Sequence, residues 1–175
     1  MQKKVVEIPF NKEFFLDSHN AIWSFSSGKR LEHNVFFTIV AIVTLTVNII
    51  AEQSNKFPVG IILSGGFLVY MLLYWSGYFA RKLKYFKKVK EQLHRYELAS
   101  TENIYTFSDI GFEYKDQEKS FKFIWSLFKP AVIYKDNILL ILKDTGLILA
   151  LTKRELGDAV YEELCNILRE KIGEI

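Results

Sequence analysis

Two apolar stretches govern the fold of this chain, VFFTIVAIVTLTVNIIA at residues 35–51 and FPVGIILSGGFLVYMLLYWSGYFA at residues 57–80. Neither stretch contains a charged side chain, and neither shows a polar face at the helical period. A helix needs about 20 apolar residues to cross a bilayer. The two stretches therefore predict a transmembrane helical hairpin over residues 34–80, with spans at 34–51 and 57–80.

Two alternative structures for these stretches fit the sequence less well. Buried core helices of a soluble bundle would need protein on every side, and a chain of 175 residues offers too little of it. A cleaved signal peptide is disfavoured because the first stretch follows a mixed-charge segment and lacks a small-residue cleavage site. Both stretches are therefore expected to stay in the protein as membrane anchors.

The composition is that of an ordered chain rich in aromatic residues. Half of the residues are hydrophobic, 15% are aromatic and 25% are charged, so the chain can bury enough apolar surface to fold. A single cysteine excludes an intramolecular disulfide and a multi-cysteine metal site. The net charge of +3 is too small to indicate nucleic-acid binding.

Cations are concentrated at the two outer ends of the predicted hairpin rather than in the loop between its spans. Lys29 and Arg30 precede the first span, whereas Lys56 is the only cation in the loop between the spans. Residues 81–100, just after the second span, carry seven cations against two carboxylates. The positive-inside rule then predicts a multi-pass protein of the inner membrane with both termini in the cytoplasm.

Residues 81–100 are predicted to form a basic amphipathic stalk helix. Their apolar side chains recur every three or four residues, and no glycine or proline separates them from the second span. The cations of the stalk have two candidate roles, which are to fix the topology or to contact anionic lipid headgroups. The candidates for headgroup contact are Arg81, Lys82, Lys84, Lys87, Lys88 and Lys90.

Small residues recur at four-residue spacing in the second span. The pairs Gly60–Ser64 and Ser76–Ala80 allow close approach of another helix. They predict helix packing, either inside the hairpin or between two copies in a homodimer. Neither span contains an ionisable side chain other than tyrosine, which disfavours a proton or ion pathway.

The parts of the chain outside the hairpin and stalk differ in size. Residues 1–33 predict a short strand at 3–8 and a helix capped by Asn11, whose apolar side chains need cover from the membrane interface or the C-terminal domain. Residues 101–175 alternate apolar and polar side chains in short runs between polar turns, which is typical of an antiparallel meander or small barrel. Thr152 and Glu155 have capping-box spacing before an amphipathic C-terminal helix. The chain thus combines a membrane helical hairpin with an α+β cytosolic domain.

This order of elements resembles that of the YcxB-like proteins, a family of small bacterial membrane proteins. The resemblance covers residues 30–172, and the chain departs from the family at Thr152, where the family often has proline. It implies a pleckstrin-homology-like (PH-like) domain at 101–175, with an antiparallel sheet or barrel capped by a C-terminal helix. The motif residues that carry it are Thr106, Phe107, Ser108, Asp109 and Gly111, then Trp125 and Ser126, then Lys135, Asp136, Ile138, Leu139 and Leu140, and finally Lys153, Arg154 and Leu156. The implied core residues are Phe107, Phe112, Trp125, Leu140 and Leu164.

The sequence contains no recognisable catalytic or cofactor motif. It has no phosphate-binding glycine loop, its three histidines lie in separate segments, and Cys165 fits a buried structural thiol better than a nucleophile. We therefore expect a non-enzymatic protein without cofactor or metal that binds or regulates a membrane-associated protein partner. The alternatives are an anionic-lipid sensor that acts through the stalk and a cryptic hydrolase. The expected partners are the lipid bilayer and a protein or a second copy, and not nucleic acid.

Overall fold

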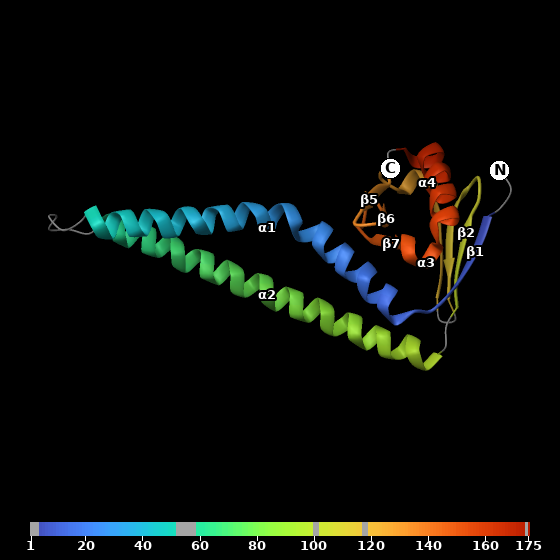
Figure 1. The fold of residues 1–175 in the computed structure, drawn as a ribbon, viewed down its shortest axis with the longest axis horizontal. Helices are drawn as coiled ribbons and strands as arrows, with labels where there is room; N and C mark the ends of the chain where they lie inside the picture. Colours follow the sequence, from blue (N-terminus) through green and yellow to red (C-terminus); the bar gives the residue numbers. More distant parts are fainter. Residues whose placement is uncertain (1–3, 52–58, 100–101, 117–118, 174) are drawn as a thin grey trace. The chain divides into compact units, whose positions relative to one another are not determined.

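The structure is a computed structural model that describes residues 4–51, 59–99, 102–116, 119–173 and 175. Backbone contacts divide the chain into two compact units. We call Met1–Phe25 with Val89–Ile175 the sheet unit, and Ser26–Lys88 the hairpin unit. Figure 1 shows the elements in chain order: β1 (Lys4–Pro9), α1 (Lys12–Ala51), α2 (Val59–Ala99), β2 (Glu102–Phe107), β3 (Gly111–Lys115), β4 (Ser120–Ile124), the short 3-10 helix η2 (Trp125–Leu127), β5 (Val132–Tyr134), β6 (Asn137–Ile141), β7 (Ile148–Thr152), α3 (Lys153–Leu156) and α4 (Asp158–Ile172).

The helix boundaries differ from the predicted segments. α1 is one continuous helix of 40 residues that begins near the N-terminus and includes the first predicted span. Asn11 caps it, since its Oδ1 accepts hydrogen bonds from the backbone N–H groups of Glu13 and Phe14. α2 continues from the second predicted span through the stalk, as its unbroken sequence predicts. The predicted loop between the spans lies outside the described residues.

The hairpin unit is held together by small and polar side chains on facing helices. Asn48 Nδ2 donates to the carbonyl oxygen of Gly60 at 3.2 Å, and Trp75 Nε1 donates to Thr38 Oγ1 at 3.0 Å. Two segments, Arg30–Ile50 and Val59–Leu98, are long and apolar enough to cross a membrane. Most of their side chains are exposed, which in water would be unfavourable for so many apolar groups.

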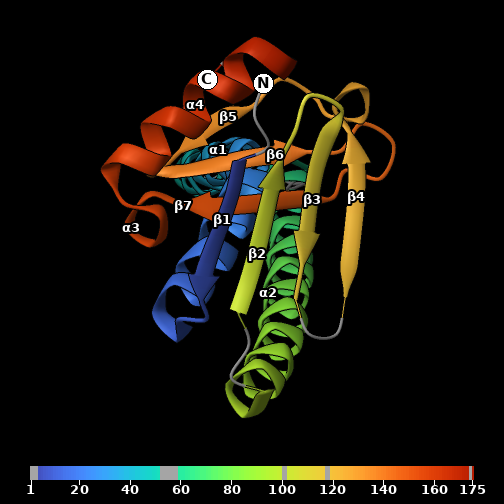
Figure 2. The same ribbon diagram turned by 90° about the vertical axis from the view of Figure 1, so that its right-hand side faces the viewer.

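The sheet unit contains two antiparallel sheets, with strand orders β1-β2-β3-β4 and β5-β6-β7. Figure 2 shows the strands of the two sheets crossing at a steep angle. β1 pairs with β2 from Lys4 opposite Phe107 to Pro9 opposite Glu102. The first sheet therefore joins a strand that precedes α1 to three strands that follow α2, although the local pattern predicted strands of the domain only after residue 101.

The core of the sheet unit lies between the two sheets and α4. Its fully buried side chains come from both sheets and the terminal helix. The residues implied as core by the family resemblance are all buried there, namely Phe107, Phe112, Trp125, Leu140 and Leu164. Trp125 also donates its Nε1–H to the Ser108 carbonyl oxygen at 2.8 Å, which satisfies its polar atom.

The predicted capping box at the start of the C-terminal helix is wrong. Thr152 occupies the N-cap position of α3, but its side chain makes no capping hydrogen bond. Its Oγ1 instead donates to Asn137 Oδ1 at 2.9 Å, so the hydroxyl is already engaged in tertiary contacts. The helix is also interrupted at Gly157, where φ is +75°, a conformation that favours glycine. α3 and α4 are therefore separate helices.

Gly111 is the position where the first sheet tolerates no side chain. A Cβ atom there would lie 2.1 Å from the backbone oxygen of Phe123 on the neighbouring strand, so the strands would have to separate. We expect Gly111→Ala to destabilise the sheet unit by about 2–4 kcal/mol, measured as a lower Tm in detergent. Gly28→Ala is the matched control, because nothing lies within 4 Å of its added Cβ in α1. Equal Tm values for the two variants would contradict the register of β3 against β4.

Candidate functional site: an aromatic cavity in the sheet unit

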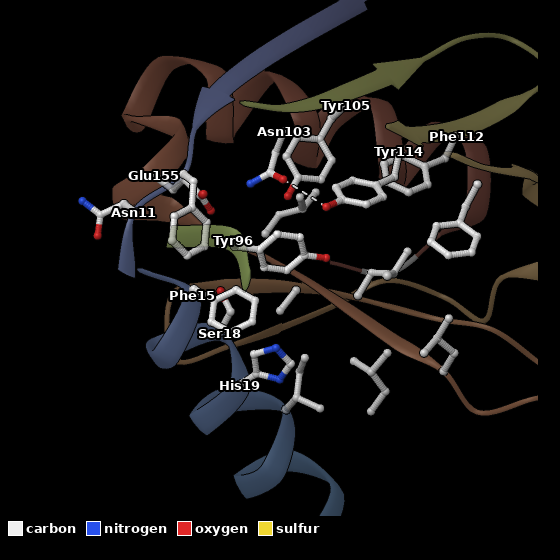
Figure 3. Close-up of a pocket in the computed structure, with 18 of the residues that line it drawn as sticks. Asn11, Phe15, Ser18, His19, Tyr96, Asn103, Tyr105, Phe112, Tyr114 and Glu155 are labelled. Atoms are coloured by element: carbon white, nitrogen blue, oxygen red, sulfur yellow. Dashed lines mark hydrogen bonds between the residues drawn. The ribbon is translucent and has the colours of Figure 1, made fainter. Parts of the chain in front are cut away.

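The sheet unit contains a partly open cavity of about 270 Å³. Its walls come from the β1–α1 junction, the first turns of α1, the last turns of α2, strands β2 to β4, β7 and α3. Figure 3 shows Phe15 and His19 on one side of the cavity, Tyr105 and Tyr114 on the other, and Tyr96 between them. Most of the lining is apolar, so the cavity suits a largely apolar occupant.

Three rings from two helices and the preceding turn form an aromatic cluster at this cavity. The ring centroids of Phe10, Phe15 and Tyr96 lie 5.7 Å from one another in each pair. The His19 ring packs edge-on against Phe15 at 4.5 Å. Such spacings are favourable for aromatic contact, and they bring the start of α1 against the end of α2.

Asp116 organises the polar side of the cavity. It is buried, and its carboxylate accepts hydrogen bonds from Tyr114 Oη at 2.8 Å, from Tyr96 Oη at 3.2 Å and from the backbone N–H of Lys119 at 2.6 Å. Tyr114 Oη also lies 3.0 Å from the side-chain amide of Asn103. The contact is to Asn103 Oδ1, an acceptor, so Asn103 and Asp116 are two acceptors for the single proton of the Tyr114 hydroxyl. Burial, reinforced by this bond to Asp116, raises the pKa of Tyr114.

Two polar side chains at the cavity have no such partners. Glu155 makes no ion pair or hydrogen bond with another described residue, and burial raises the pKa of its carboxyl to about 7. The Tyr105 hydroxyl likewise has no hydrogen-bond partner within the described part of the chain. Burial, and secondarily the negative charge of Glu155, raises the pKa of Tyr105. Both side chains are half-buried, and a polar group that is partly removed from water without a partner loses hydrogen bonds, so both can gain from an additional partner in the cavity.

The cavity carries no permanent positive charge. Its described lining includes no lysine or arginine, and burial lowers the pKa of His19 to about 4, so this ring is neutral at pH 7. Two cations on α1 and α3 are paired elsewhere, since Lys12 pairs with Glu97 and Arg154 pairs with Asp17. Within the described lining, Glu155 is therefore the side chain that can carry charge near pH 7.

A chain of hydroxyl and amide groups ties α1 to the second sheet beside the cavity. Ser18 Oγ lies 2.7 Å from Thr152 Oγ1, which donates its own proton to Asn137. Ser18 must then be the donor to Thr152. Asn137 Nδ2 in turn donates to the carbonyl oxygen of Lys135 at 2.7 Å. The start of α1 is thus attached to β6 and β7 by bonds that proline at position 152 could not make.

The site residues proposed from the sequence lie elsewhere. All six candidate headgroup cations are exposed on α2. Gly60 lies against Asn48 of α1, and Ser64 is buried and donates its hydroxyl to the Gly60 carbonyl oxygen at 2.7 Å. Ser76 and Ala80 are not buried in the hairpin, so a role for this pair in packing against a second copy stays a prediction. None of these residues lines the cavity.

The sequence contained only a partial signal for this cavity. The apolar face of the helix after Asn11 was predicted to need cover, and Phe15 and Ile22 of that face line the cavity. Tyr96 belongs to the apolar stripe of the stalk helix, which was also predicted to need a partner, and it lines the cavity. Glu155 carried no local sign of a site, because it lies in a capping pattern. Among the described residues, no cluster of three His, Cys, Asp or Glu side chains could hold a metal ion. Comparisons with protein-family models, curated proteins and solved structures found no match to this chain.

Glu155 and His19 are expected to act on stability with opposite pH dependence. The raised pKa of Glu155 stabilises the folded protein fully below about pH 4.5, and this contribution is lost as the pH rises through 7. The lowered pKa of His19 contributes stability above about pH 6.5 that is lost as the pH falls through 4.

Single substitutions should therefore separate the two effects in Tm measurements between pH 4.5 and 8. Glu155→Gln should raise Tm at pH 8 relative to the parent, by about 5 °C, and leave Tm at pH 5 nearly unchanged. His19→Asn should instead remove the loss of Tm on acidification from pH 6.5 to 4.5. Parallel pH profiles for the parent and Glu155→Gln would show that Glu155 is not buried as described.

Proposed function

We propose that this protein is a non-enzymatic membrane protein of the inner membrane, with two spans and both termini in the cytoplasm. Its sheet unit is proposed to be a PH-like interaction domain that binds and regulates a membrane-associated protein partner. The proposal is supported by the two exposed apolar helical segments and by the excess of cations after the second span.

The continuity of the two long helices carries this proposal. The sheet unit contains the first turns of α1 and the last turns of α2, while the rest of both helices belongs to the hairpin unit. A change of packing in the sheet unit that moves these turns therefore acts on helices that continue without a break into the hairpin. We propose on this basis that binding in the domain acts on the membrane segment through these helices.

The arrangement of strands supports the PH-like part of the proposal. A sheet of four antiparallel strands and a sheet of three are followed by a C-terminal helix that buries an apolar face against the core. This is the order expected for a PH-like domain, with the difference that the first strand precedes the hairpin. Membership of the YcxB-like family is proposed on the same basis, together with the motif residues in the sequence.

The groups around the cavity favour binding over hydrolysis. The cavity does gather titratable groups with shifted pKa values, which is a reason to test for catalysis. However, Ser18 is the only serine, threonine or cysteine in its described lining, and its hydroxyl donates to Thr152. A serine that is bonded in this way has no general base to activate it.

The proposed topology can be tested with single cysteines in a Cys165→Ser background. Ser54, which lies outside the described residues, falls in the predicted external loop, whereas Asp144 lies in the turn between β6 and β7. A membrane-impermeant maleimide should label Ser54→Cys in intact cells and label Asp144→Cys only after the inner membrane is permeabilised. Labelling of both variants in intact cells, or recovery of the protein in the soluble fraction, would refute the proposal.

The second candidate function is an anionic-lipid sensor, which is favoured by the exposure of all six stalk cations. In nanodiscs that contain phosphatidylglycerol, Lys84, Lys87 and Lys88 should react more slowly with an amine-acylating reagent than in neutral nanodiscs. High salt should remove the difference, because it screens the attraction. Lys129, which is exposed after η2, is the control residue. Equal rates in both lipids would leave the lysines with a role in topology alone.

A further inference from the structure

We infer that the cavity of the sheet unit is a binding site for a small organic amine, protonated at its nitrogen and with a single ring or short chain as its body. This inference goes beyond the proposed function, because it concerns a ligand inside the domain. It rests on the shape, the charge and the unpartnered polar atoms of the cavity. It also applies to the protein in detergent, whatever membrane topology is found.

The size and lining of the cavity limit the occupant. A volume of about 270 Å³ is at the small end of ligand sites, which fits one ring with a short substituent. The rings of Phe10, Phe15 and Tyr96 line the cavity and suit contact with such a body. Aromatic faces attract a cation through their quadrupoles, so a lining of this kind favours an ammonium group over an anionic one.

The charges at the cavity select the same class of ligand. Glu155 from α3 ionises around pH 7 and has no cationic partner in the described chain, and Asp116 accepts hydrogen bonds from Tyr96 and Tyr114, which line the cavity. The other titratable groups facing the cavity are uncharged at pH 7, since His19 of α1 is neutral and the tyrosines are protonated. A carboxylate or phosphate ligand would meet negative charge without any compensating cation.

The unpartnered atoms explain why a protonated amine fits better than a neutral molecule. An ammonium group can only donate hydrogen bonds. Both the carboxylate of Glu155 and the hydroxyl oxygen of Tyr105 can accept a hydrogen bond from it. These two groups are close enough for the charge of Glu155 to affect the pKa of Tyr105. A protonated amine would therefore pair the half-buried carboxylate of Glu155 and the half-buried hydroxyl of Tyr105 together.

Three probes of nearly equal size test the charge preference in the detergent-solubilised full chain. Phenethylamine is cationic, phenethyl alcohol is neutral and hydrocinnamate is anionic at pH 7. By calorimetric titration, we expect the amine to bind about tenfold more tightly than the alcohol, and the acid most weakly. Affinity for the amine should rise from pH 6 to pH 8, because Glu155 ionises over this range. Affinity for the alcohol should not rise.

Matched variants assign the preference to the two residues. Glu155→Gln should reduce affinity for the amine about tenfold and abolish its rise with pH, while affinity for the alcohol is retained. Glu162→Gln, the same change on the exposed face of α4, should leave both affinities unaltered. Tyr105→Phe should weaken amine binding by a smaller factor of about threefold. Circular dichroism and Tm confirm that each variant is folded.

The outcomes are decisive for this inference. Binding of the alcohol or the acid as tightly as the amine would overturn it, as would the absence of binding by any of the three probes to the folded parent protein. If Glu155→Gln fails to fold, the pH profile of the parent and the Tyr105→Phe variant still decide between the outcomes. A negative result here leaves the proposed membrane topology intact, and a failed topology test leaves this site intact.

Discussion

The pairing of β1 with β2 is the constraint that organises the whole sheet unit. Its six residue pairs join segments that are separated in sequence by both long helices. Without β1, the backbone polar groups along one edge of β2 would lack partners. Closing so long a connection costs little more entropy than closing a moderate one, so a hairpin can be inserted between the strands. Once β1 is in place, the start of α1 and the end of α2 must both lie in the sheet unit.

That return of the chain creates the cavity. Phe10 and Phe15 follow β1 directly, Tyr96 precedes β2, and Glu155 follows β7, so residues from distant segments meet around one volume. The bond between Ser18 and Thr152 holds α1 against the second sheet. Polar groups inside the unit then divide into two kinds. Asp116 is satisfied by three donors, whereas Glu155 and Tyr105 are left without a described partner. This contrast separates a structural network from the proposed binding site.

Features that depend on local periodicity were predictable, and features that depend on tertiary partners were not. The continuity of the stalk with the second span, the helix cap at Asn11 and the strands after residue 101 all follow from spacing within a few residues. Thr152 and Glu155 show where this kind of inference fails. Their spacing matches a capping box, but the threonine hydroxyl bonds to Asn137 and Ser18 instead. The glutamate lines a cavity. Tertiary hydrogen bonds and packing override a local cap, because such a cap is worth only about 1 kcal/mol.

The order of residues was enough to define the two apolar helical stretches, the positions of the strands and the amphipathic C-terminal helix. The sequence sufficed for these elements because the hydrophobic pattern of a helix or strand repeats within a few neighbouring residues. Tertiary contacts were needed to establish that the strands form two sheets, that the first strand comes from before the hairpin, and that Glu155 and Tyr105 line the same cavity. Those features arise between residues far apart in the chain, and such contacts leave no periodic trace in any one segment.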